Sequence, residues 1–333
     1  MSSEVKELKN LFNRIGAALL VFLAADNLLC GGAAEITTIV TAITDSAVAY
    51  ILTDLLSSVA YFATYTIPAW LFFRISRNKK TEPVGLSFSI PENSSIVEPV
   101  AYGFIGAALC FCLSYVNSLL APVPPKVAEI LFQADLDAGY KLVLMFISVA
   151  IVPALAEEFL FRGVILSNIR PYSEGGAILI SALLFGLMHQ TAFQFLYTTG
   201  LGIVLGIVYV KTKSIWCGVI LHFFNNYLSI IQEYLMAQQN EKAGYVVYYI
   251  SILLTFLVGV ILCAIALELR NKGTKQTENE IGVFGKCQEQ REVAWRQKET
   301  GVLRNACFSP TMMIYTAMCV LTMIFNSIML AVI

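Results

Sequence analysis

The sequence predicts an all-α, polytopic membrane protein with about eight core transmembrane helices and one further C-terminal span. Two features of composition support this fold class. Hydrophobic residues make up 57% of the 333 residues and charged residues only 14%, whereas soluble domains carry about 25% charged residues. The mean hydropathy is +0.71. In addition, several apolar runs reach the roughly 20 residues that a helix needs to cross a bilayer.

These apolar runs place each expected helix. We expect transmembrane spans near 11–30, 48–73, 97–121, 142–165, 176–192, 194–210, 214–236, 244–267 and 309–333. The first is the weakest because it contains Asp26 and Asn27. The resulting segments are N-terminal spans (1–96), a core (97–235), a following span (236–267), a polar cytoplasmic insertion (268–308) and a C-terminal span (309–333).

Loop charges provide an independent estimate of topology, because Lys and Arg collect in short cytoplasmic loops. Alternate loops hold most of the cations: Lys6, Lys9 and Arg14; Arg74, Arg77, Lys79 and Lys80; Arg162 and Arg170; Lys211 and Lys213; Arg270, Lys272 and Lys275. We therefore expect a multi-pass protein of the cell membrane with a cytoplasmic N-terminus. The net charge of −1 shows no basic field, so we expect no nucleic-acid partner.

Ionisable side chains inside the expected spans carry the functional signal. A charged group at mid-membrane costs about 2.5–3.5 kcal/mol on insertion scales, so such residues are expected to face a partner or a wet cavity. The three segments that contain them read AEEFLFR (156–162), FGLMH (185–189) and HFFNN (222–226), and they include both histidines of the chain.

Helical geometry assigns these side chains to faces. Glu158 and Arg162 are four residues apart, which suits an ion pair. Glu157 points about 100° away from Glu158, so it is free to face something else. His222 and Asn226 again share a face. Three helices can thus direct Glu157, His189 and the His222/Asn226 pair into one cavity.

Two kinds of chemistry fit this set. A carboxylate beside an imidazole can orient and deprotonate a water, while a second imidazole and a carboxamide donate hydrogen bonds to the oxyanion formed at a peptide carbonyl. Alternatively, Glu157, His189 and His222 are the ligands of a catalytic zinc with an open fourth position. The residues alone leave both open.

Structural roles compete with catalysis for each residue taken singly. Glu158 and Arg162 can form a purely structural ion pair, and His189 or the His222/Asn226 pair can join helices by hydrogen bonds worth about 0.6 kcal/mol on average. An idle role for all of them is the least favoured interpretation, because it places several costly groups in one bundle without use.

The three motifs together resemble the CPBP family, also called Abi, which groups type II CAAX prenyl endopeptidases with bacterial membrane proteases and bacteriocin self-immunity proteins. EExxxR is matched at 157–162, FxxxH at 185–189 and HxxxN at 222–226, with no motif residue substituted. The resemblance covers about 97–235 and leaves the segments after 267 without a counterpart.

What the resemblance implies is a helical membrane fold whose cavity opens toward the cytoplasm and cleaves peptides near the membrane. By motif position, Glu157 is the catalytic carboxylate, His189 its partner on the water, and His222 and Asn226 the oxyanion stabilisers. Although the family is commonly labelled metalloprotease, its prenyl-protease members look like enzymes that need no metal. We therefore favour no cofactor, with zinc as the alternative.

The expected function is an intramembrane endopeptidase acting on a membrane-associated peptide or protein, with CAAX-type processing of a prenylated substrate as one option. The main alternative is a non-enzymatic binding or immunity protein that uses the same polar cavity. A transporter is disfavoured, since we find neither inverted repeats nor a matched pair of broken helices.

Overall fold

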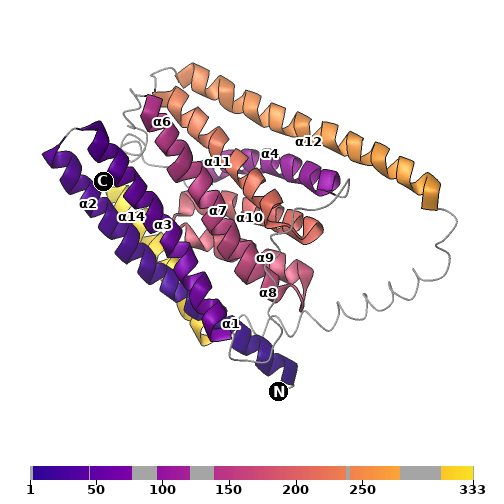
Figure 1. Ribbon diagram of the computed structural model, residues 1–333, viewed down its shortest axis with the longest axis horizontal. Coiled ribbons are helices and arrows are strands. Elements are labelled where there is room, and N and C mark those ends of the chain that lie inside the picture. Colours follow the sequence, from indigo (N-terminus) through magenta and orange to yellow (C-terminus); the bar gives the residue numbers. More distant parts are fainter. Residues whose placement is uncertain are drawn as a thin grey trace.

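The computed structural model of the protein describes residues 3–44, 46–76, 96–120, 139–237, 241–277 and 309–332. Helices account for nearly all of these residues, and no strand occurs among them. The helices gather into one bundle (Figure 1). The predicted all-α, polytopic class is confirmed.

The N-terminal part folds back on itself as two long helical rods. The first rod consists of α1 (Ser3–Ala25), the π-helical turn η1 (Asp26–Cys30) and α2 (Gly31–Ile43), and the second is α3 (Ala47–Ser76). The predicted span 11–30 was therefore too short. Asn27 does not end the helix, because its side-chain amide donates to the Leu23 carbonyl oxygen at 2.8 Å inside the rod.

The middle of the chain supplies the helices that surround the site. One continuous passage contains α6 (Gly139–Met145), η3 (Phe146–Ile151), α7 (Val152–Glu158), η4 (Phe159–Leu166) and α8 (Ser167–Ile169). The remaining helices of this part are α4 (Val97–Leu120), α9 (Glu174–Met188), α10 (Ala192–Thr212) and α11 (Ile215–Ala237). Two π-helical stretches flank α7, and such stretches are frequent at functional sites.

The last two described helices are α12 (Glu241–Thr277) and α14 (Pro310–Val332). The first part of the predicted polar insertion continues α12 as helix to Thr277, and residues 278–308 lie outside the described residues. Helix α14, which has no counterpart in the resemblance, packs against α1 and α9. It also contributes Tyr315 and Cys319, both fully buried, to the main hydrophobic core.

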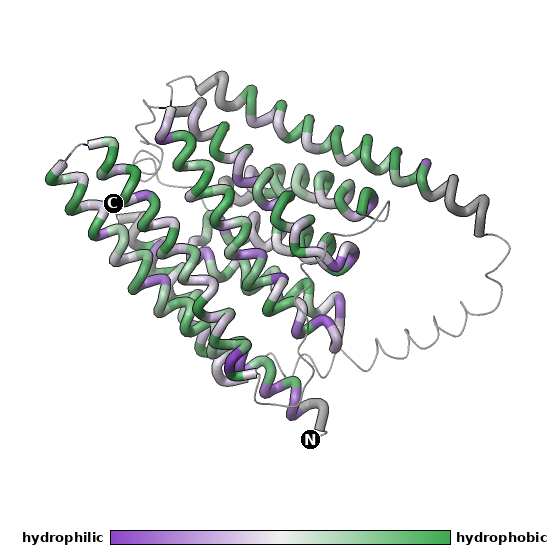
Figure 2. Tube along the Cα trace, viewed as in Figure 1, coloured by the Kyte–Doolittle hydropathy of each residue, from purple (hydrophilic) through white to green (hydrophobic). Residues whose placement is uncertain are grey.

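Within the described ranges, seven helical segments are long and apolar enough to cross a membrane, and two shorter apolar helices, Glu174–Met188 and Ile215–Ile231, lie among them. Apolar residues run along most of each helix (Figure 2). The core is built from aromatic and aliphatic side chains of α1, α3, η4, α9 and α14. The charged motif residues lie beside this core, where α3, α7, α9 and α11 approach one another.

Candidate active site

Two adjacent glutamates end helix α7, and the fold buries both of them. Glu157 is 3% exposed, and Glu158 and Arg162 are fully buried. Arg162 Nη1 donates to Glu158 Oε1 at 2.6 Å, as the spacing of four predicted. Arg162 is therefore not the loop cation that the charge pattern suggested. It lies inside the bundle, where its guanidinium also covers the Phe185 ring at 4.8 Å.

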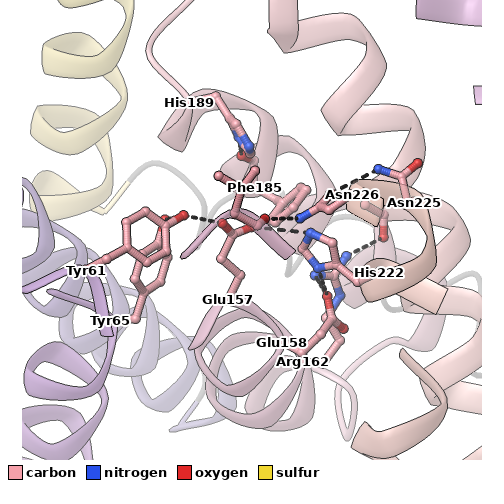
Figure 3. Close-up of polar contacts among 12 residues, drawn as sticks. Tyr61, Tyr65, Glu157, Glu158, Arg162, Phe185, His189, His222, Asn225 and Asn226 are labelled. Carbon is pink, nitrogen blue, oxygen red and sulfur yellow. Dashed lines mark hydrogen bonds and ion pairs between the residues drawn. The ribbon is translucent and has the colours of Figure 1, made fainter. Parts of the chain in front are cut away.

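The Glu157 carboxylate is held from one side and free on the other. The Tyr61 hydroxyl of α3 donates to Oε1, and Tyr61 and Tyr65 share a hydrogen bond of 3.0 Å. Oε2 is buried without a hydrogen-bond partner. Figure 3 shows Glu157 between Tyr61 on one side and His222 on the other. A buried acceptor without a donor is costly to keep, so Oε2 is poised for an incoming donor.

His222 connects the two glutamates. Its Nδ1 lies 3.1 Å from Glu158 Oε1, and its Nε2 lies 3.8 Å from Glu157 Oε2. Since the ion-paired Glu158 carboxylate can only accept, Nδ1 carries the proton of this hydrogen bond. The Glu158–Arg162 ion pair is therefore not isolated, because Glu158 also accepts a hydrogen bond from His222.

His189 follows the last turn of α9, and its ring has a defined tautomer. Its Nδ1 lies 2.9 Å from the Phe185 carbonyl oxygen. A carbonyl oxygen only accepts, so Nδ1 is the donor, and in the neutral ring Nε2 keeps a free lone pair. His189 lines the same cavity as Glu157 and His222. An imidazole with one free acceptor nitrogen is the form that can act as a base.

Phe185 contacts side chains from all three motifs. Its ring makes edge contacts with His189 at 5.1 Å and with His222 at 5.8 Å between centroids, and it lies beneath the Arg162 guanidinium. Phe185, the first residue of the second motif, thus packs in contact with both histidines. It thereby limits the rotation of both rings.

Asn226 is oriented by a neighbour that the sequence analysis left without a role. Asn226 Nδ2 donates to the Val149 carbonyl oxygen at 3.1 Å, and its Oδ1 accepts from Asn225 Nδ2 at 3.2 Å. Asn225 is in turn held by the Tyr197 hydroxyl at 2.6 Å. Because an amide NH2 has two hydrogens, Asn226 keeps one donor free.

A cavity of about 350 Å³ joins these side chains. It contains all four predicted catalytic residues, whereas Glu158 and Arg162 lie behind it. Its lining is Tyr61, Ser148, Val149, Pro153, Glu157, Phe185, His189, Gln194, Tyr197, Thr198, Leu201, His222, Asn225, Asn226 and Ser229.

Tyr61, Tyr65 and Asn225 were missed by the sequence analysis. The available signal was weak: Tyr61 and Tyr65 are two hydroxyl-bearing residues four apart inside a span, and Asn225 adjoins the third motif.

The alternative zinc site would take its ligands from Glu157, His189 and His222. Among the residues that the structure describes, no three His, Cys, Asp or Glu side chains gather closely enough to hold a metal ion. Glu157 Oε1 accepts from Tyr61, and His222 Nδ1 faces Glu158. These bonds leave Glu157 Oε2, His189 Nε2 and His222 Nε2 with lone pairs that no hydrogen bond uses.

Comparison with known proteins matches the segment that builds this site. Residues 139–228 match the family model for Type II CAAX prenyl endopeptidase Rce1-like. Membrane peptidase YdiL of Bacillus subtilis is 32% identical over 104 residues, which cover 30% of this chain and 42% of that protein. Membrane-embedded CAAX protease MroQ of Staphylococcus aureus is 25% identical over 180 residues, 50% of this chain and 70% of its own.

The matched region spans less than half the length of the first of these relatives. No solved structure matches the chain significantly. A cavity with a buried carboxylate beside histidines, in a chain similar to two proteins named as a membrane peptidase and a membrane-embedded protease, is the arrangement expected of the class of intramembrane endopeptidases. Within this class, residues 139–228 are similar to the Rce1-like type II CAAX prenyl endopeptidases. The predicted resemblance is confirmed over these residues.

Proposed function

We propose that this protein hydrolyses a peptide bond of a membrane-associated peptide or protein with a water activated by Glu157 and His189. The observation that carries the proposal is the free oxygen of Glu157. It is buried, lacks a hydrogen-bond donor and belongs to a cavity that also contains both histidines. A water in the cavity supplies the missing donor.

The steps follow from the donors and acceptors present. Glu157 Oε2 takes one proton from the water, His189 Nε2 accepts a hydrogen bond from the other water hydrogen, and the water oxygen adds to the substrate carbonyl carbon. The free Asn226 N–H is the candidate donor to the resulting oxyanion, and His222, whose Nδ1–H is used by Glu158, adds a second donor from Nε2 when its ring is doubly protonated. Glu157 then passes the proton to the leaving nitrogen as the C–N bond breaks.

We further propose that the reaction needs no metal. Support comes from the ligand arrangement, since no three His, Cys, Asp or Glu side chains of the described residues gather closely enough to hold a metal ion. Metal analysis of the purified protein, together with a chelator, tests this point. We expect cleavage to persist in the chelator, and a loss that zinc restores would contradict the proposal.

The substrate class is argued from the family. The family description and the name of MroQ both refer to CAAX proteins, so a prenylated C-terminal peptide is the first substrate to test. The cavity lining contains no Lys or Arg. Among the described residues it therefore offers no Lys or Arg to pair with a free C-terminal carboxylate, which supports an endopeptidase over a carboxypeptidase.

The proposed location is the cell membrane, with the N-terminus in the cytoplasm. Arg14 Nη1 donates to Ser76 Oγ at 3.1 Å, so the basic start of α1 and the basic end of α3 lie at the same end of the bundle. This arrangement supports the alternation of loop charges and hence the cytoplasmic assignment of that end.

The deciding experiment is cleavage in liposomes. Wild type, Glu157→Gln and the control Glu174→Gln receive a farnesylated CAAX peptide and a mixed peptide pool, and new termini are read by mass spectrometry. We expect Glu157→Gln to lose about 10²–10⁴-fold in rate, the range of a general base, while the control stays active. Full activity of Glu157→Gln would refute the proposed role of Glu157, whereas the absence of new termini with wild type would favour a binding or immunity protein.

A further inference from the structure

Gln190, the residue after His189, has an unusual backbone conformation. Gln190 has a φ of 53°, and Lys213 is the other non-glycine residue with a positive φ in the described ranges. For a residue with a side chain, this left-handed conformation costs about 1–2 kcal/mol. Gln190 directly follows His189, so whatever holds Gln190 also fixes the backbone that carries the His189 ring.

Two elements far from the motifs contact Gln190. Asn326 of α14 donates from Nδ2 to the Gln190 carbonyl oxygen at 2.9 Å. The Asp26 carboxyl group of η1 faces the Gln190 side chain. Both residues lie outside the segment matched by the family model. The N-terminal rod and the C-terminal helix thus meet at the residue beside His189.

Helix α14 is held against α1 by close contacts near its start. Near its start, Thr311 Oγ1 donates to the Asn13 carbonyl oxygen at 2.9 Å. A Cβ atom added at Gly16 of α1 would lie 2.5 Å from Thr311 Oγ1, so the two helices touch through a small residue, as is common in membranes. Further along, Tyr315 is fully buried. Figure 1 shows α14 running beside α1.

We propose that α14 is a positioning element of the active site: Asn326, with Asp26, holds Gln190 in its left-handed conformation and so aims His189 at Glu157. This role rests on the proposed function of His189. The physical basis is local, because the Asn326 hydrogen bond offsets the backbone cost at Gln190. Without that bond the turn relaxes, and the His189 ring loses its fixed direction.

The chain contains only two histidines, which allows a direct test. The full-length protein, labelled with 15N-histidine, is placed in nanodiscs, and the two rings are assigned with His222→Gln. In Asn326→Ala we expect the His189 signals to shift while the His222 signals stay. Ser327 is the neighbouring residue on the same helix, so Ser327→Ala is the matched control. We expect it to leave the signals of both histidines unchanged.

Peptide cleavage provides the second readout. In Asn326→Ala we expect kcat to fall about tenfold, the effect of one lost hydrogen bond, with KM unchanged. Adding Gln190→Gly restores most of the rate, because glycine adopts a positive φ without strain. If Asn326→Ala does not fold, Asn326→Asp removes the donor while keeping the shape and is expected to behave in the same way.

The outcomes separate this proposal from the proposed function. A wild type that cleaves nothing would reject the peptidase, while the histidine spectra would still report on positioning. Unchanged histidine signals together with an unchanged kcat in Asn326→Ala would overturn the positioning role. Equal shifts of both histidines, with a lowered thermal midpoint, would reduce Asn326 to a general structural contact and would equally overturn it.

Discussion

At the scale of single residues, the hydrogen-bond partners of each buried charged group distinguish its role. Glu157 and Glu158 are neighbours in sequence with the same chemistry, yet their partners differ. Glu158 meets the Arg162 guanidinium and a His222 nitrogen, whereas Glu157 meets a tyrosine hydroxyl and keeps one oxygen free. One carboxylate is neutralised as part of the structure, and the other remains available for proton transfer.

Removing the hydroxyl of Tyr61 tests how Glu157 is held. In Tyr61→Phe the carboxylate loses its donor on Oε1 and can rotate, so we expect kcat for peptide cleavage to fall about tenfold, in line with one hydrogen bond to a charged group. Tyr65→Phe is the matched control, since its hydroxyl bonds Tyr61 and its loss is expected to have a smaller effect. An equal loss in both variants would contradict this order.

The chain offers two Glu–Arg pairs of the same spacing, one buried and one exposed. Glu158→Gln leaves the buried Arg162 charge without its partner, so we expect the free energy of unfolding in detergent to fall by about 3–5 kcal/mol. Glu174→Gln removes the partner of Arg170 at the surface. We expect it to change the free energy of unfolding by about 0–1 kcal/mol. Denaturant titration of both variants measures the difference. Equal effects would show that Arg162 is solvated.

At the scale of helices, close packing of α9 and α10 positions His189. Gly186 makes this packing possible, because a Cβ atom there would overlap Thr199 Oγ1 and approach the Phe195 carbonyl oxygen at 3.0 Å. His189 lies three residues further along the chain. A shift of α9 therefore moves the histidine relative to Glu157.

Substitution of glycine on α9 tests this packing. We expect Gly186→Ala to lower the free energy of unfolding by about 1–3 kcal/mol, the usual cost of overpacking, and to reduce cleavage. Gly175→Ala on the same helix has nothing within 4 Å of its added Cβ, so stability and activity are expected to stay close to wild type. Thermal unfolding in micelles measures the loss of stability. A Gly186→Ala variant as stable as wild type would contradict the proposed close packing of α9 and α10.

At the scale of the whole molecule, the charges of the loops are the basis of the proposed orientation in the membrane. The bond between Arg14 and Ser76 joins two basic segments at one end, while the turn between α2 and α3 lies at the other end of both rods. By the positive-inside rule, the proposed location of the basic end is the cytoplasm.

Cysteine accessibility tests this orientation. In a background without the eight native cysteines, we expect Lys9→Cys and Lys213→Cys to react with an impermeant thiol reagent in inside-out vesicles and to be protected in intact cells. Thr44→Cys, before α3, is expected to show the opposite pattern. Labelling of Lys9→Cys in intact cells would reverse the proposed topology.

The sequence by itself determined the fold class and most helix positions, and it predicted the six motif residues of the candidate site. It could do so because membrane insertion responds to local hydropathy and because an ionisable residue in an apolar span is costly wherever it occurs. The helical spacing of Glu158 and Arg162 even predicted their ion pair, since that contact lies within one turn.

The tertiary structure alone decided which remote groups meet those residues. Tyr61 reaching Glu157, Asn225 orienting Asn226, and Asn326 holding the residue after His189 all depend on how helices rotate about their axes and pack against distant segments. Local patterns do not encode these rotations, because a tyrosine or asparagine in a span suits many faces. Only the assembled bundle selects the face, and with it the partner.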